Sequence, residues 1–306
     1  MFLARLNNKG MNLMNKLIIS EFEDFLINDK NVSKSTLASY IRDIVNFSKY
    51  MDTIKIDMLC AKKNHVLSYI VCMQNSGKAN SSVMRAIASL KSMYAFLLSK
   101  GAIAQNPVLD ITPPKKEKLM PQFLSREEID ALLNCPDMST TKGIRDKAML
   151  EIMYASGLKV SEIITMSLDD IDVDLGYIRC SKGNNIRIVP LGKMAVNAAK
   201  SYLTVARPMM ADETETTLFV NCMGCTMSRQ GLWKMIKEYA NKAGIRKSIT
   251  PHSLRHSFAV HLMENGADLL SIQEMLGHKD ASSTQMYARM FHKRLREVYN
   301  KAHPRA

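Results

Sequence analysis

The sequence lacks any long hydrophobic run. No segment approaches the ~18 consecutive apolar residues that a membrane-spanning helix needs. Residues 1–17 also lack the uninterrupted apolar stretch of a signal peptide, because Arg5, Lys9 and four asparagines break it. We therefore expect a cytoplasmic protein that does not insert into a membrane.

Cysteine, glycine and proline are sparse. The 306 residues include six cysteines, 13 glycines and nine prolines, and no segment repeats or falls to low complexity. In a chain without an export signal we expect reduced thiols. Cys222 and Cys225 have the spacing of metal ligands, but no second pair or histidine follows closely, so we predict no metal site.

Acidic residues are outnumbered. The chain has 42 lysines and arginines against 29 aspartates and glutamates, a formal net charge of +13. Residues 1–114 hold 14 of the basic and eight of the acidic residues, so both parts of the chain share the excess. A positive field of this extent suits a polyanionic partner, because neutralising phosphates releases counterions. The alternative is a basic protein with no such partner.

The first third of the chain has the periodicity of helices. Apolar residues recur at three- and four-residue steps over residues 37–47, and Ser33 or Ser35 is expected to cap this helix. A second apolar face spans residues 87–97, and three capping candidates precede it: Asn80, Ser81 and Ser82. Weaker patterns over residues 16–29 and 64–75 complete four predicted helices.

Prolines at 107, 113, 114 and 121 interrupt this periodicity and predict an extended, exposed linker. A capping-box pattern at Ser125 then opens a new helix. The sequence thus predicts four parts: a tail at residues 1–10, a helical domain at 11–101, a linker at 102–122 and a second domain at 123–306.

The second domain mixes helices with a little sheet. Residues 148–166 are predicted helical with a break near Gly157, and residues 177–189 read as a hairpin around a Gly- and Asn-bearing turn. A further short strand is expected at residues 218–220. Helices are expected at residues 230–243 and from Leu254 onward.

The segment from Thr250 to Ser257 is the richest in groups for phosphate chemistry. Pro251 at a helix start leaves His252 and Arg255 one turn apart on one side of the helix. Arginine supplies a charged fork for phosphoryl oxygens, histidine relays a proton, and tyrosine offers an oxygen nucleophile. Taken singly, each such residue is more simply a cap, a packing residue or a solvated charge.

Taken together and in order, several segments resemble the tyrosine recombinases, most closely the bacterial Xer branch. The resembling segments are Tyr154–Glu162, Ser181–Asn184, Pro251–His256, Leu276–His278, the region of Tyr287, Asn106–Asp110 and Leu295–Ala306. The resemblance covers nearly the whole chain beyond the first ten residues. It implies a mainly α fold with a small β-sheet: an N-terminal four-helix, SAM-like core-binding domain for DNA, and a mixed α/β catalytic domain.

The resemblance also implies a mechanism in which a tyrosine cleaves one DNA strand and forms a 3′-phosphotyrosyl link. Tyr287 matches the nucleophile, His252 the group that assists its proton transfer, and Arg255 an arginine that holds the scissile phosphate. Lys182 matches the general acid for the leaving 5′-oxygen, and His278 a hydrogen-bond donor to the phosphate. No cofactor and no metal are expected.

One position departs from the family pattern. Where the first catalytic arginine is expected, this chain has Lys159, which keeps the charge but loses the two-pronged fork. We therefore expect lowered activity. Arg145 is near in sequence, but it matches a structural Arg–Asp pair and is a weak candidate for compensation.

The expected partner is a double-stranded DNA recombination site. Two domains joined by a linker could enclose a duplex, and the candidates for base contact are Ser228, Arg229, Gln230, Arg42 and Lys91. The resemblance implies a homo- or hetero-tetramer on DNA, in which the helix at residues 293–301 docks into a neighbouring protomer.

The sequence is therefore identified as a site-specific DNA recombinase, and resolution of chromosome or plasmid dimers is a role that the Xer resemblance implies. Two alternatives stay open. One is an integrase or invertase of a mobile element, which shares the same motifs. The other is an accessory DNA-binding protein whose cleavage is impaired by Lys159.

Overall fold

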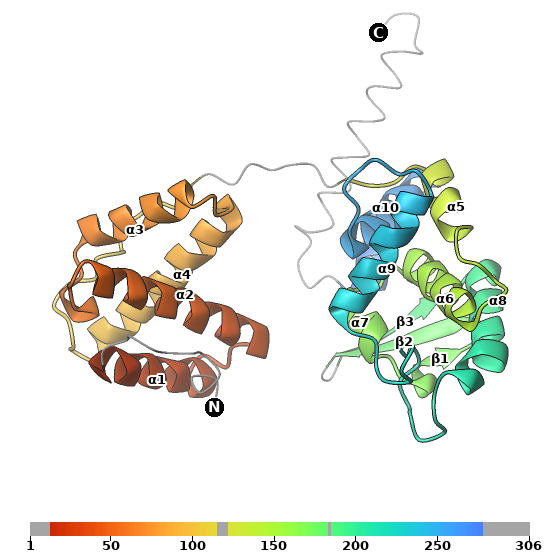
Figure 1. Cartoon of the computed structure of the whole chain (residues 1–306), viewed down its shortest axis with the longest axis horizontal. Coiled ribbons are helices and arrows are strands. Elements are labelled where there is room, and N and C mark those ends of the chain that lie inside the picture. Colours follow the sequence, from red (N-terminus) through yellow and green to blue (C-terminus); the bar gives the residue numbers. More distant parts are fainter. Residues whose placement is uncertain (1–12, 115–121, 183–184, 278–306) are drawn as a thin grey trace, which may run out of the picture. The chain divides into compact units, whose positions relative to one another are not determined.

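A computed structural model describes residues 13–114, 122–182 and 185–277 (Figure 1). Contacts between Cα atoms divide the chain into two compact units, Met1–Lys118 and Leu119–Ala306. The described residues are mainly helical with one small sheet, so the expected fold class is confirmed. No helix among them is long and apolar enough to cross a membrane.

Four α-helices make up most of the described part of the first unit. They are α1 (Leu13–Asn28), α2 (Lys34–Thr53), α3 (Lys63–Asn75) and α4 (Asn80–Ser99), with a short 3₁₀ turn η2 at Met58–Cys60. Their apolar faces meet in one core, in which Phe22, Phe47 and Tyr94 are fully buried. The four predicted helices are confirmed.

The two predicted helix starts in this unit differ in outcome. Ser33 caps α2, because its side chain accepts a hydrogen bond from the Thr36 amide at 3.2 Å. The predicted cap of α4 is wrong: Ala79 occupies the cap position without a side-chain bond, and Asn80 is already helical. The three polar candidates lie inside the first turn of α4, one position too late to cap it.

The segment after α4 is less exposed than predicted. Val108 and Ile111 are 0% and 3% exposed and lie in the core of the first unit. The Asn106 side chain accepts a hydrogen bond from the Val108 amide at 2.9 Å, and Lys91 Nζ donates to the Leu109 carbonyl at 3.1 Å. Two apolar side chains three residues apart therefore fasten this part of the expected linker to the helices.

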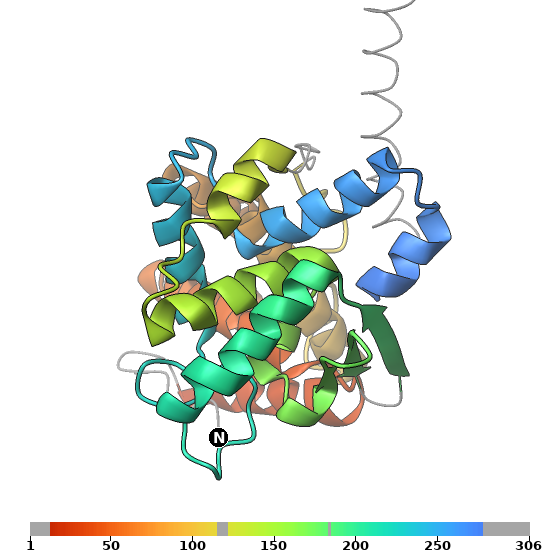
Figure 2. The same cartoon turned by 90° about the vertical axis from the view of Figure 1, so that its right-hand side faces the viewer.

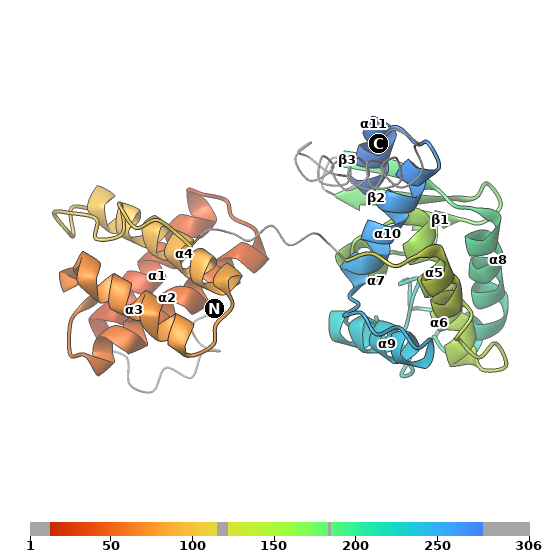
Figure 3. The same ribbon diagram turned by 90° about the horizontal axis from the view of Figure 1, so that it is seen from above.

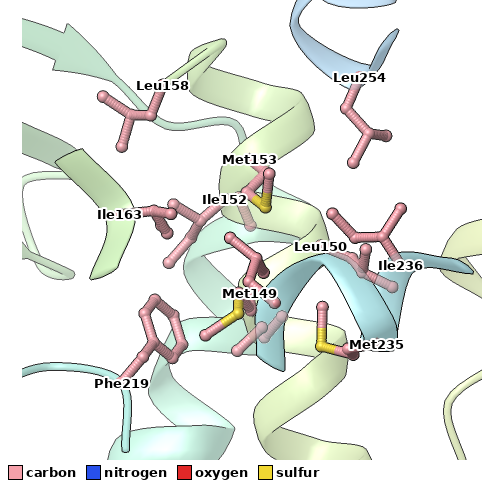
Figure 4. Close-up of a cluster of buried hydrophobic side chains, with 14 of the residues drawn as sticks. Met149, Leu150, Ile152, Met153, Leu158, Ile163, Phe219, Met235, Ile236 and Leu254 are labelled. Atoms are coloured by element: carbon pink, nitrogen blue, oxygen red, sulfur yellow. The ribbon is translucent and has the colours of Figure 1, made fainter. Parts of the chain in front are cut away.

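The second unit is built around a central helix, α6 (Thr141–Ser156). Side chains on nearly all sides of this helix are buried. The helix packs against α8 (Lys193–Ser201) and α10 (Pro251–Glu264) (Figure 2). Figure 4 shows α6 side chains among Ile163, Ile236 and Leu254 from three other helices. The remaining helices are α5 (Arg126–Leu133), α7 (Val160–Thr165), α9 (Arg229–Lys242) and α11 (Leu269–Leu276), with short turns η3 (Leu168–Asp170), η4 (Tyr202–Ala206) and η5 (Arg207–Met209).

A three-stranded antiparallel sheet lies at one side of this unit. Its strands are β1 (Ile171–Asp172), β2 (Tyr177–Lys182) and β3 (Asn185–Pro190), in the order β1-β2-β3. Strands β2 and β3 form the predicted hairpin, and the pairing continues to Lys182 opposite Asn185. Helix α11 lies beside β3 (Figure 3).

Two further predictions about this unit have different outcomes. The helix break near Gly157 is confirmed, since Gly157 ends α6 in the left-handed conformation. The predicted strand at residues 218–220 is wrong, because this segment forms only two isolated bridges, one at Thr217 just before it and one at its last residue, Val220. Leu218, Phe219 and Val220 are all buried, so the segment runs through the core instead of alternating between two faces.

Candidate active site

The start of α10 presents His252 and Arg255. Pro251 occupies the first turn, where its missing amide donor is not needed, and the Thr250 amide donates to Ser253 Oγ at 3.1 Å. One helical turn separates these two candidate residues. His252 keeps part of its surface in solvent and is partly desolvated by its neighbours, whereas Arg255 is only 4% exposed.

Arg255 bridges the ends of two helices. Its Nη1 donates to the Gly157 carbonyl at the end of α6, and its Nη2 donates to the Leu276 carbonyl at the end of α11, both at 2.6 Å. Carbonyls at a helix C-terminus lack helical partners and carry partial negative charge, which suits a buried guanidinium.

Gly157 allows this close packing. Its φ of +59° is unfavourable for other residues, and a Cβ here would lie 2.5 Å from Phe258 Cδ1 and 2.8 Å from Leu276 Cδ2. Only glycine therefore lets the end of α6 approach α10 and α11 so closely.

Lys159 stands two residues after Gly157, at the N-cap of α7. Its amide donates to Glu162 Oε2 at 2.9 Å, which fixes the first turn of the helix. Loss of hydration lowers the pKa of His252 below its usual value of 6.5, and the positive charges of Arg255 and Lys159 lower it further. Both effects favour the uncharged imidazole, which is the form that can accept a proton.

Two residues that the sequence reasoning missed lie next to these groups. Arg187 on β3 donates to both oxygens of Glu162, at 3.1 and 2.8 Å, and its Nε donates to the Met275 carbonyl at 2.9 Å. Burial tends to raise the pKa of Glu162, but the bonds from Arg187 and the Lys159 amide outweigh it, so this pKa lies below its ordinary value.

An inverted pattern on β3 could have revealed Arg187. Ile186 and Ile188 are 65% and 63% exposed, whereas the side chain of Arg187 between them is 18% exposed. A strand that turns its charged residue inward and its apolar residues outward indicates a specific partner for the charge.

Comparison with known proteins places this geometry in a family. The Phage integrase family profile matches residues 122–294, and the profile of the phage integrase N-terminal SAM-like domain matches residues 19–101. The chain belongs to the phage integrase family. The predicted resemblance to tyrosine recombinases of the Xer branch is confirmed by relatives of that name.

One such relative is the tyrosine recombinase XerD of Listeria innocua serovar 6a. It is 42% identical over 294 residues, which cover 94% of this chain and 99% of the relative. The crystal structure of XerA recombinase is 26% identical, with a TM-score of 0.54 and coverage of 95% and 99% of the two chains. The structure of XerH bound to palindromic difH substrate, 20% identical, shares the fold with a TM-score of 0.75 over 96% and 91%. The protein is a tyrosine recombinase.

Of the residues predicted for the recombinase site, the structure brings Lys159, His252 and Arg255 together at the ends of α6, α7 and α10. Lys182 is the last residue of β2, at the tip of the hairpin. His278 and Tyr287 lie outside the described residues, as does the predicted docking helix at residues 293–301.

Two other candidates from the sequence, Arg145 and Ser228, have local structural partners. Arg145 is buried and donates to Asp146 at 2.7 Å and to the Val220 carbonyl at 3.0 Å, as the predicted Arg–Asp pair requires. Ser228 caps α9 by accepting a bond from the Gly231 amide. Cys222 and Cys225 are exposed free thiols, and no group of three metal-binding side chains occurs in the described part of the chain.

Proposed function

We propose that this tyrosine recombinase is a site-specific enzyme that cleaves and rejoins double-stranded DNA with Tyr287 as its nucleophile. The observation that carries this proposal is the fixed guanidinium of Arg255, which lies between two helix ends with His252 and Lys159 beside it. Cations held in place before the substrate arrives can stabilise the charge that develops on a phosphate during transfer.

The proposed step conserves the energy of the phosphodiester bond. Tyr287 Oη attacks the phosphorus while the bond to the 5′-oxygen breaks, which forms a 3′-phosphotyrosyl bond and a free 5′-hydroxyl. The uncharged His252 accepts the phenol proton, and Lys182 donates a proton to the leaving oxygen. Arg255, with Lys159 and His278, holds the non-bridging phosphate oxygens. Attack by a 5′-hydroxyl of another strand reverses the step.

Lys159 is expected to slow the DNA-cleavage step of this enzyme. Its ammonium group keeps a positive charge near the phosphate, but a lysine cannot make the bidentate contact of an arginine. The hydrogen bond from the Lys159 backbone amide to Glu162 holds this part of the chain in place whichever side chain residue 159 carries. We therefore expect slow cleavage that an arginine at this position accelerates.

The partner and assembly follow from the same reading. The DNA-bound XerH structure, which shares the fold, supports a recombination site in duplex DNA as the substrate. We propose that residues 11–101 and 123–306 act as the core-binding and catalytic domains, joined by residues 102–122. We also propose a cytoplasmic homo- or hetero-tetramer, coupled by the helix at residues 293–301, that resolves chromosome or plasmid dimers. The mobile-element alternative is not favoured, because the similar relatives are XerD recombinases.

A covalent-trapping experiment tests the proposal. The protein is incubated with nicked DNA carrying candidate recombination sites, and the covalent adduct is measured on a denaturing gel. We expect an adduct that disappears in Tyr287→Phe and forms about 10- to 100-fold faster in Lys159→Arg, a gain below the ~10²–10³ that loss of a whole donor costs. Binding without an adduct in either form would replace the proposal with an accessory DNA-binding role.

A further inference from the structure

We propose that Arg187 is a positioning residue that holds three separate parts of the active site in register. These parts are the β2–β3 hairpin, which carries Lys182 at its tip, the start of α7 at Lys159, and the end of α11 just before His278. The inference rests on the proposed function and deepens it, because it assigns the alignment of the general acid to a residue outside the reacting groups.

Three bonds from one guanidinium make the connection. Two go to the carboxylate of Glu162 on α7, at 3.1 and 2.8 Å, and one goes to the Met275 carbonyl on α11, at 2.9 Å. Glu162 Oε2 also accepts the amide proton of Lys159. A bidentate arginine–carboxylate pair is directional as well as strong, so it fixes orientation and not only distance.

The pairing of β2 with β3 extends the position fixed by Arg187 to the tip of the hairpin. Arg187 pairs with Cys180 across the ladder, and the register continues through Ile186 opposite Ser181 to Asn185 opposite Lys182. The Arg187 anchor thus lies only two ladder positions from the general acid. Strand β1 pairs only with Tyr177 and Ile178, so the tip of the hairpin consists of two strands alone, and two paired strands have little stability of their own. The tip therefore needs such an anchor to stay aligned.

The end of α11 is packed directly against the same guanidinium. A Cβ at Gly277 would lie 2.8 Å from Arg187 Nη1, and the φ of Gly277 is +61°. Arg255 binds the neighbouring Leu276 carbonyl at 2.6 Å, so two arginines hold consecutive carbonyls of this last turn. His278 is the next residue of the chain after Gly277.

The test compares cleavage of two substrates by Arg187→Gln. One is ordinary nicked DNA, and the other has sulfur in place of the leaving 5′-oxygen. A thiol is a far stronger acid than an alcohol, so the sulfur leaves without help from a general acid. Misplacement of a reacting group by about 1 Å costs on the order of 10²-fold in rate. We therefore expect Arg187→Gln to cleave ordinary DNA roughly 100-fold more slowly than wild type. On the sulfur substrate the loss of cleavage rate should be at least about tenfold smaller. The affinity for DNA should stay within about threefold of wild type.

Arg179→Gln is the matched control. Arg179 lies on the same hairpin and pairs with Asp170 at 3.6 Å, but its described bonds stay within the region of η3 and the sheet. We expect its cleavage rate on both substrates to stay close to that of wild type. Arg187→Lys, which keeps the charge but loses the fork, carries the same comparison if the glutamine variant is too unstable to purify.

Two results would overturn the inference while leaving the proposed function intact. One is cleavage of ordinary DNA by the folded Arg187 variants at the wild-type rate. The other is an equal loss on both substrates, which would show that Arg187 does not align Lys182. Absence of a covalent adduct with the wild-type protein on either substrate would instead refute the proposed function, and the inference with it.

Discussion

Replacing Gly157 by alanine tests how the end of α6 is packed against α10 and α11. The substitution adds one methyl group at a residue whose φ is +59°. That methyl carbon would lie 2.5 Å from the ring of Phe258 and 2.8 Å from Leu276 Cδ2. Both distances are far below van der Waals contact, so either the neighbours or the backbone must move.

The expected loss has two parts. The left-handed backbone conformation costs an alanine about 1–2 kcal/mol relative to glycine. Overpacking against Phe258 and Leu276 adds about 1–3 kcal/mol, since a close-packed interior yields little. Gly244→Ala separates the two parts, because Gly244 has a φ of +69° but no atom within 4 Å of its added Cβ. Gly157→Ala should therefore destabilise the second unit by about 1–3 kcal/mol more than Gly244→Ala does.

The single tryptophan of the chain provides the assay. Trp233 lies on α9 in the second unit, so its fluorescence during urea unfolding reports on that unit and not on the first. The free energy of unfolding is compared between the wild type and the two alanine variants. Equal losses in the two variants would refute the packing argument, and no loss in either would refute the backbone argument as well.

Two further perturbations follow from the charges of the site and the core. The pKa of His252 lies below its usual 6.5, so its ring gains a proton only at acidic pH. The cleavage rate should therefore be constant from about pH 8 to about pH 7. It should decrease below about pH 6.5, because a protonated ring no longer accepts the phenol proton. The cleavage rate of His252→Gln should lack this decrease. If the variant shows the same decrease at acidic pH, the titrating group is not His252. Asp146→Ala should cost about 3–5 kcal/mol, because Arg145, 3% exposed, would lose its partner. Asp174→Ala, which removes an exposed pair with Lys200, should change the urea midpoint far less, and equal shifts would contradict this reasoning.

The helices could be predicted because their causes lie within a few residues of each other. Apolar residues at three- and four-residue steps over residues 37–47 give one buried face, and Leu37, Ile41, Ile44 and Phe47 do lie in the core. The capping box at Ser125 is formed by Glu128 three residues later. The hairpin and the end of α6 at Gly157 depend on equally local backbone preferences.

The recombinase motifs could also be recognised in the sequence, because their order resembles the pattern of a known family. That resemblance predicted Lys159, His252 and Arg255 as site residues. It did not predict the burial of Arg255, whose partners are carbonyls 98 and 21 residues away in the chain.

Tertiary packing decided the rest, since contacts between distant segments leave no periodic trace in the sequence. Residues 218–220 look like a strand, but packing buries all three instead of alternating them. Val108 and Ile111 lie among prolines that indicate a linker, yet they fill the core of the first unit. The bond of Arg187 to Glu162 joins a strand to a helix 25 residues apart. Sequence thus determined the helices and named the candidate reacting groups. The fold decided which of these groups meet, because only folding brings distant donors and acceptors within hydrogen-bond distance.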